Sequence, residues 1–267
     1  MIPRITAAIM LVSALAALPA AGLLTLLAPG RHIQFFVAFF ISIGAILAFG
    51  VFEHRSAIFG SIFWKGLPGQ NRVALTFDDG PNEPFTGQVI EILRTNRISA
   101  TFFVIGKNAR KFPGTLKSLA DEGFEIGNHG WSHEVLPLKT PATIREEISK
   151  TSDLIRMITG RRPSLFRAPH GWRNPWVNRV ARELGCTPVA WSLGVWDTDR
   201  PGFRAIVDRV LKGARDGTVL LLHDGRGIED KADSSQLIQA LPDIIAALKQ
   251  RGFRFVTLSQ MMDSEAR

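Results

Sequence analysis

The chain has 267 residues, a formal net charge of +8 and one cysteine, Cys186. The single cysteine excludes an intrachain disulfide and a cysteine-rich metal site. The basic surplus suits anionic lipid headgroups, and we find no nucleic-acid-binding motif.

Two apolar segments open the chain within a predicted membrane region, residues 1–60. Residues 5–28 and 33–52 contain no charged side chain, and each is long enough to cross a bilayer core of about 30 Å as a helix. Only "PGRH" separates them, so we predict a transmembrane hairpin. Two alternatives stay open. The first segment resembles a secretory signal, with "ALPAAG" as a cleavage region, or one segment is a surface or buried helix.

The number of spans predicts the side of the membrane on which the rest of the chain lies. Two spans return the chain to the side of its N-terminus, which predicts a two-pass inner-membrane protein with a cytoplasmic catalytic domain. A cleaved signal followed by a stop-transfer segment gives the same side, whereas a single span places the domain outside. Basic residues flank both ends of the hairpin but also occupy its turn, so their count favours the cytoplasmic side only weakly.

Beyond residue 70, short apolar runs alternate with amphipathic segments. The runs predict seven strands, at residues 72–77, 99–105, 124–129, 164–169, 187–193, 217–223 and 253–258. The intervening segments have helical spacing, and they lie at residues 84–96, 113–123, 140–160, 174–185, 201–216 and 235–251. Strands that alternate with helices predict an α/β fold, either a sheet or a barrel, over residues 70–260.

Polar side chains recur where these strands end. Asp78 and Asp79 end the first strand, His129 the third, Arg167 the fourth and His223 the sixth. In barrel-like folds, functional groups lie at the carboxyl ends of strands. The pattern therefore predicts one shared site.

The paired aspartates and the segment "NHGWSH" are consistent with a metal site. His129 and His133 are four residues apart, so a helix or tight turn would place both imidazoles on one side. A carboxylate completes a His₂Asp set typical of catalytic zinc. Two adjacent carboxylates repel each other, and a cation on Asp79 would leave Asp78 free to accept a proton. An ordinary surface turn is the alternative for "DDGP".

In this order, "TFDDGP", "ATFFVIG", "FEIGNHGWSH", "FRAPHG", "WSLGVWD" and "VLLLHD" resemble the polysaccharide deacetylases, the NodB-homology domains of carbohydrate esterase family 4. The resemblance implies a distorted (β/α) barrel of about seven strands that removes acetyl groups from N-acetylated sugars. It also implies a divalent metal, normally Zn²⁺, held by Asp79, His129 and His133.

The same resemblance implies the remaining roles. Asp78 corresponds to the general base, Arg167 to the arginine that holds it, His223 to the general acid and Asp197 to the carboxylate that orients this acid. Trp191 and Leu221 correspond to hydrophobic substrate-binding positions that line the acetyl pocket, and His170 corresponds to a substrate-binding position in the groove.

Two departures from the family pattern affect these assignments. His170 stands where the family usually has tyrosine, and this chain contains no tyrosine. Thr198 stands where an aromatic residue often follows the Asp197 position, which leaves Asp199 as an alternative partner for the acid.

We therefore predict a membrane-anchored, metal-dependent deacetylase. Its substrate is the N-acetyl group of an amino sugar in a polysaccharide, in peptidoglycan or in a polyprenyl-phosphate-linked glycan. A hydrolase of another amide, such as a formyl group, and a non-catalytic glycan- or lipid-binding membrane protein are the alternatives. The sequence does not indicate an oligomeric state.

Overall fold

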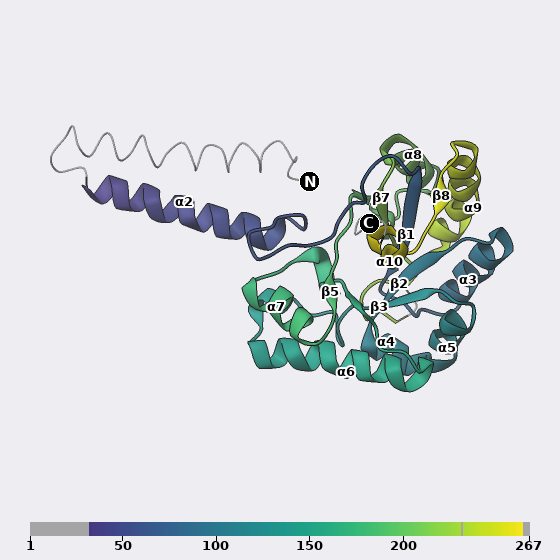
Figure 1. Ribbon diagram of the computed structural model, residues 1–267, viewed down its shortest axis with the longest axis horizontal. Coiled ribbons are helices and arrows are strands. Elements are labelled where there is room, and N and C mark those ends of the chain that lie inside the picture. The colour runs from purple at the N-terminus through teal and green to yellow at the C-terminus, as the bar shows by residue number, and fades with distance from the viewer. Residues whose placement is uncertain (1–31, 231, 264–267) are drawn as a thin grey trace.

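The computed structural model describes residues 32–230 and 232–263 (Figure 1). Its strands are β1 (Arg72–Asp78), β2 (Ala100–Val104), β3 (Glu125–Asn128), β4 (Leu165–Phe166), β5 (Thr187–Pro188), β6 (Leu193–Gly194), β7 (Thr218–His223) and β8 (Arg254–Phe255). Its α-helices are α2 (His32–Phe52), α3 (Phe85–Asn96), α4 (Gly106–Lys111), α5 (Pro113–Asp121), α6 (Pro141–Thr159), α7 (Pro175–Glu183), α8 (Phe203–Gly213), α9 (Ser235–Gln250) and α10 (Leu258–Asp263).

The strands form one parallel, curled sheet in the order β5-β4-β3-β2-β1-β7-β6, with β8 paired to the start of β1. The α/β prediction is confirmed, with two differences. The sheet has eight strands where about seven were expected. It is also an open half-barrel, because no pairing among the described residues joins β5 to β6. The polar ends of its strands lie on one edge, since every pairing is parallel.

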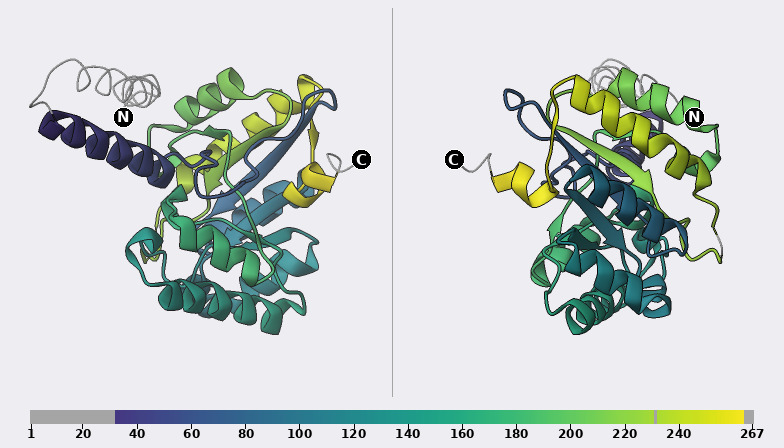
Figure 2. Two further views of the ribbon diagram at one scale, coloured as in Figure 1. Left: turned by 60° about the vertical axis from the view of Figure 1, so that its left-hand side comes forward. Right: turned by 90° about the vertical axis from the view of Figure 1, so that its right-hand side faces the viewer.

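Alternation along β1 assigns its side chains to the two faces of the sheet. Val73, Leu75 and Phe77 join the main core with buried residues of α3, α5, α8 and α9, which cover the outer face (Figure 2). The intervening residues therefore face the inside of the curl, because successive strand side chains point to opposite faces. Ala74 packs there against α10. Thr76 and Asp78 follow toward the carboxyl end, so the chain places a hydroxyl and then a carboxylate in the interior.

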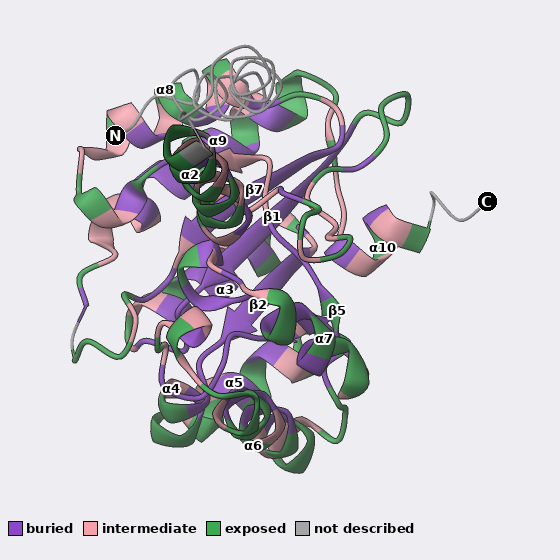
Figure 3. Cartoon of the chain, turned by 90° about the vertical axis from the view of Figure 1, so that its left-hand side faces the viewer, coloured by how far each residue is buried: buried purple, intermediate pink, exposed green. Residues whose placement is uncertain are grey.

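Local sequence signals explain where the outer helices begin. Thr140 caps α6 by accepting a hydrogen bond from the Thr143 N–H at 3.2 Å, and Pro141 follows it in the first turn. Asn174 caps α7 in the same way, with acceptor distances of 3.0 Å from two backbone N–H groups. Figure 3 shows the result, with buried strands inside and the exposed residues on the outer helices.

Three predicted strands differ from the structure. The strand predicted at 164–169 shortens to the two residues of β4. The run 187–193 divides into β5 and β6, because Val189 pairs instead with Phe63 in an isolated bridge. The run 253–258 becomes β8 followed by α10, a helix that the apolar pattern did not predict.

Helix α2 coincides with the second predicted membrane segment and extends away from the sheet (Figure 1). Many of its apolar side chains are exposed, among them Phe40 at 66% and Ile41 at 67%. Within the described part of the chain, no helix combines the length and the hydropathy of a membrane span. The predicted hairpin is thus not confirmed, and its first segment, 5–28, lies outside the described residues.

Candidate active site

The backbone at the end of β1 separates the two adjacent aspartates. Asp78 is the last residue of the strand, whereas Asp79 adopts a left-handed conformation with φ of 75°. A neighbouring loop holds Asp79 in place, because its Oδ2 accepts a hydrogen bond from the Gly227 N–H at 2.9 Å. Its carbonyl oxygen accepts another from Asn108 Nδ2 at 2.7 Å. The two carboxylates therefore meet different partners.

Asp79 lies against the two histidines of "NHGWSH". Its Oδ1 is 3.3 Å from His129 Nε2 and 3.1 Å from His133 Nε2, and one ligand atom from each residue lies within 4.8 Å of the other two. Burial would raise the pKa of Asp79, but the two imidazoles hold it well below its usual value. The structure thus brings the three predicted metal ligands together.

The chemistry of these donors fits a divalent cation. His129 Nδ1 lies 2.8 Å from the Arg167 carbonyl oxygen, to which its N–H donates a hydrogen bond, so that in the neutral imidazole the lone pair of Nε2 is on the side of Asp79. Asp79 Oδ1 is buried and has no hydrogen-bond partner among the described residues. A buried oxygen without a donor carries a high desolvation cost, and a bound cation removes that cost.

The segment that carries the histidines is a loop, where a helix or tight turn was expected. Glu147 of α6 fixes its shape. Its carboxylate accepts hydrogen bonds from the N–H groups of Trp131 and Ser132, both at 2.9 Å, and from the Ser132 hydroxyl at 2.7 Å. Sequence reasoning missed Glu147 because it lies within an amphipathic helix, where an acidic residue ordinarily faces solvent.

Asp78 is paired with a fully buried arginine. Arg167 Nη1 donates to Asp78 Oδ1 at 2.7 Å and to the Thr76 hydroxyl at 2.8 Å, and Nη2 donates to the Ala190 carbonyl at 3.0 Å. The guanidinium carbon is 4.1 Å from the centre of the Phe103 ring. Burial lowers the pKa of Arg167, although the charge of Asp78 opposes this shift. Asp78 is thus held in one orientation at the edge of the metal-ligand group.

His223 at the end of β7 is paired with Asp197. His223 Nδ1 is 3.0 Å from Asp197 Oδ1, and its backbone N–H donates to Oδ2 at 2.7 Å. Burial would lower the pKa of His223, but the negative charge of Asp197 raises it to about 10. The contact is made by Asp197 and not by the alternative, Asp199. A cavity of about 240 Å³ opens beside this pair.

The three predicted substrate positions lie around the same edge. His170 is exposed, has φ of 60°, and places its ring centre 4.5 Å from that of His133. Trp191 lies with its ring 5.8 Å from the Arg167 guanidinium carbon. Leu221 is 7% exposed and lies opposite Thr76 in the pairing of β1 with β7. Hence each predicted residue lies at the carboxyl-end edge or beside it.

A further buried carboxylate, which the sequence analysis did not assign, lies close to the turn that follows the two aspartates. Asp224 Oδ2 accepts a hydrogen bond from the Thr86 hydroxyl at 2.6 Å, and burial raises the pKa of Asp224 to about 7. A Cβ atom on Gly80 would lie 2.2 Å from the same oxygen. The sequence signal that could have identified Asp224 was its position directly after His223 in "LLLHD".

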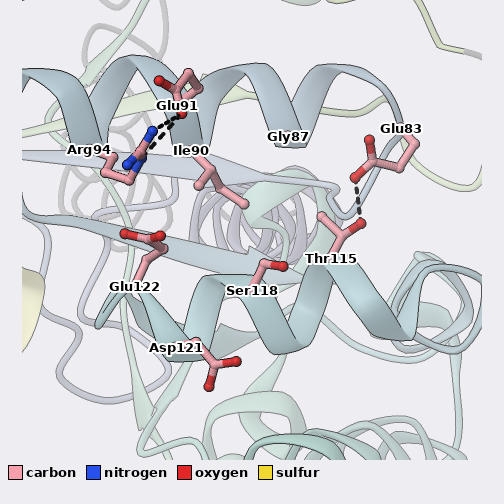
Figure 4. Close-up of a pocket in the computed structure, with 9 residues that line it drawn as sticks. All are labelled: Glu83, Gly87, Ile90, Glu91, Arg94, Thr115, Ser118, Asp121 and Glu122. Carbon is pink, nitrogen blue, oxygen red and sulfur yellow. Dashed lines mark hydrogen bonds and ion pairs between the residues drawn. The ribbon is translucent and has the colours of Figure 1, made fainter.

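A larger cavity lies elsewhere, between α3 and α5 (Figure 4). It has a volume of about 430 Å³ and contains none of the predicted site residues. Its lining includes the acidic side chains of Glu83, Glu91, Asp121 and Glu122. The size of a cavity therefore does not identify the active site. The cluster of titratable side chains at the carboxyl ends of the strands identifies it.

Known proteins resemble the chain over the same region. A family model described as polysaccharide deacetylase matches residues 65–189. The chain is 36% identical over 208 residues to a peptidoglycan-N-acetylglucosamine deacetylase from Bacillus cereus, which covers 76% of this chain and 93% of the relative. It is 36% identical over 202 residues to a chitooligosaccharide deacetylase from a Bradyrhizobium species, with 73% and 92% covered. The structure of peptidoglycan deacetylase PdaC from Bacillus subtilis superposes with a TM-score of 0.65 at 34% identity, covering 75% of this chain and 94% of that chain.

Proposed function

The chain belongs to the polysaccharide deacetylase family, and we propose that its substrate is an N-acetylated amino sugar, of the N-acetylglucosamine type, within a glycan. The chain is a carbohydrate N-deacetylase, which hydrolyses an amide to acetate and a free amine. The observation that carries the proposal is the combination of an Asp-His-His group, with Asp79 and His129 buried, and two charge pairs at one edge of the sheet. Peptidoglycan and chitooligosaccharide relatives support the substrate class.

The site supplies the groups that amide hydrolysis needs. Asp79, His129 and His133 would hold a divalent cation, for which we propose Zn²⁺ because two imidazoles and one carboxylate suit it. When bound, the cation supplies Lewis-acid polarisation of the amide carbonyl and activation of water. The hydrogen bond from Arg167 holds the Asp78 carboxylate in one orientation, in which it would accept the proton of the attacking water.

His223 supplies the proton that the leaving nitrogen requires. An amide nitrogen leaves poorly as an anion, so protonation by a neighbouring acid speeds the collapse of the tetrahedral intermediate. Asp197 holds the imidazole through Nδ1, which directs Nε2 away from the pair, and its charge keeps the ring protonated. The base and the acid are therefore separate residues on neighbouring strands, β1 and β7.

We also propose that α2 attaches the catalytic domain to a membrane. Its 21 residues include no Asp, Glu, Lys or Arg, and exposed apolar side chains line it. A cytoplasmic domain would act on a lipid-linked glycan precursor, and an extracytoplasmic one on peptidoglycan or an exported polysaccharide. Reporter fusions at the C-terminus separate the two arrangements, because an active periplasmic reporter rules out the cytoplasmic one.

The decisive test is acetate release by the detergent-purified full-length protein. The substrates are chitooligosaccharide, peptidoglycan and a polyprenyl-phosphate-linked N-acetylated sugar, each assayed with Zn²⁺ and with chelator. We expect release with Zn²⁺, loss with chelator, and a decrease in kcat of about 10²-fold or more for Asp78→Asn, whose metal content should not change. Faster release of formate from N-formyl substrates would favour the alternative amide. No release from any substrate by the metal-loaded protein would contradict the proposal.

A further inference from the structure

The segment that follows α2, residues 53–56, is fastened to the wall of the site by one buried arginine. Arg173 is 1% exposed, and it donates from Nη1 to the His54 carbonyl at 2.8 Å. Its Nη2 donates to the carbonyls of Glu53 at 2.9 Å and Ser56 at 2.8 Å. Burial lowers the pKa of Arg173 to about 10, so the guanidinium stays charged at neutral pH. Such charge-assisted bonds hold the segment in one conformation.

This fastened segment places His54 against Trp191. The two rings are stacked, with centres 4.2 Å apart and planes 12° from parallel. His54 Nε2 also lies 3.2 Å from the Trp191 carbonyl oxygen. The next residue extends the contact, because Arg55 Nη2 donates to the Ser192 carbonyl at 3.2 Å. The Trp191 ring and the carbonyl of the next residue, Ser192, are therefore both contacted by residues that directly follow α2.

Two other groups lie beside the Trp191 ring. A Cβ atom on Gly171 would lie 2.6 Å from the tip of the indole, and Gly171 has φ of 71°, which other residues rarely adopt. The Arg167 guanidinium, which also holds Asp78, lies near the same ring. The indole is half-buried, and a shift toward His54 or toward Gly171 would disturb these neighbours. Removal of His54 would open one face of the indole and give it room to move.

We propose that His54 is a positioning residue that sets the orientation of Trp191 and thereby the size of the acyl group that the site accepts. The inference rests on the proposed function, since Trp191 is assigned to the acetyl pocket by resemblance. His54 precedes residue 65, where the family match begins, so this contact adds a group from outside the matched region. The segment that joins α2 to the domain is then part of the active site and not only a linker.

The test compares His54→Ala, which removes the stack, with His54→Phe, which keeps a flat ring in place. Each full-length, zinc-loaded variant is assayed on N-acetyl and N-propionyl chitooligosaccharides, and kcat and KM are determined separately. For His54→Ala we expect kcat/KM on the acetyl substrate to fall by about tenfold, and the preference for acetyl over propionyl to narrow. His54→Phe should restore most of the preference. Met157→Ala, which truncates a 74% exposed side chain on α6, serves as the control.

The readout separates positioning from stability. A merely structural contact would lower Tm and reduce activity on both substrates by the same factor, so the acyl preference would not change. An unchanged preference in His54→Ala, with normal wild-type activity, overturns the inference and leaves the proposed function intact. A wild-type protein that releases no acid from either substrate contradicts the proposed function itself.

Discussion

At the scale of single residues, the site depends on how differently two adjacent aspartates are surrounded. Asp78 continues the strand and meets Arg167, whereas the left-handed backbone at Asp79 turns its carboxylate toward His129 and His133. The cationic partner on one side and the metal-ligand geometry on the other remove the conflict between two neighbouring negative charges. In the proposed function, one dipeptide thus provides both the proton acceptor and a metal ligand.

The acid has a testable pH dependence. Asp197 raises the pKa of His223 to about 10, so the imidazole should stay protonated across neutral pH, and kcat/KM should fall as pH rises toward that value. Asp197→Asn removes the charge and returns the pKa toward its ordinary value of about 6.5, which moves the alkaline limb to lower pH by at least about one unit. The measurement is the pH profile of kcat/KM for the zinc-loaded enzyme.

Asp199→Asn is the matched control, since Asp199 lies two residues away and the structure pairs His223 with Asp197. The alkaline limb of its kcat/KM profile should coincide with that of the wild type. The assignment would be contradicted if Asp199→Asn shifted this limb and Asp197→Asn did not.

The His223–Asp197 pair should also make the stability of the fold depend on pH, and stability should decrease as pH rises. Because the folded pKa lies above the unfolded one, the pair stabilises the fold fully below about pH 6.5, and this contribution is lost as pH rises toward 10.

The residues that sequence reasoning found are those with a local signal. Asp78, Asp79, His129 and His223 are polar groups that interrupt apolar runs at strand ends, and the parallel sheet brings such ends together. Glu147 gave no comparable signal. It acts on a loop about 15 residues earlier in the chain, and its i,i+4 neighbours on α6 do not reveal that contact. His54 and Arg173, 119 residues apart, were missed for the same reason.

At the scale of elements, long apolar runs predicted the central strands well, and short ones did not. Strands β1 and β7 agree with their predicted ranges within one residue, because both faces of each are buried and the whole run must pair. The outer strands β4, β5 and β6 shorten to two residues each at the sheet margin. The hydropathy of a run indicates that its residues are buried, not that they pair in a sheet. At the margin of the sheet, residues beyond the last paired one are still buried, so the apolar runs there are longer than the strands.

The close approach of β1 and β7 at their carboxyl ends yields a stability prediction. A methyl group on Gly80 would lie 2.2 Å from Asp224 Oδ2, which also accepts the Thr86 hydrogen bond. Gly80→Ala should therefore lower the free energy of unfolding by about 1–3 kcal/mol, measured by urea denaturation. The control is Gly114→Ala on α5, where nothing lies within 4 Å of the added methyl. It should be neutral or stabilise by up to about 1 kcal/mol, and equal effects at both sites would refute the packing explanation.

At the scale of the whole molecule, an open half-barrel and a projecting helix meet at the active-site wall. The sequence predicted an apolar segment at 33–52 and a separate catalytic domain. It could not predict that the segment after α2 lies beside Trp191, because the contacts of Arg173 depend on the folded loop after β4. If α2 attaches to a bilayer, this contact fixes the distance of the catalytic edge from the membrane surface. A glycan close to that surface would then be the substrate that the enzyme reaches most readily.

Membrane attachment through α2 can be tested by the depth of a single side chain. Ile41 is 67% exposed on α2, and Met157 is 74% exposed on α6, so each can be changed to cysteine and labelled with a fluorophore while Cys186 stays buried. In vesicles of phosphatidylcholine and phosphatidylglycerol, acyl-chain-brominated lipids should quench the label at position 41 severalfold more than the label at 157. The physical reason is that apolar surface gains about 25 cal/mol per Å² on leaving water, and a row of exposed apolar residues along one helix gains it together. Aqueous iodide should show the opposite preference. If iodide reaches both labels equally and brominated lipid quenches neither, α2 does not enter the bilayer, and its apolar side chains require a protein partner instead.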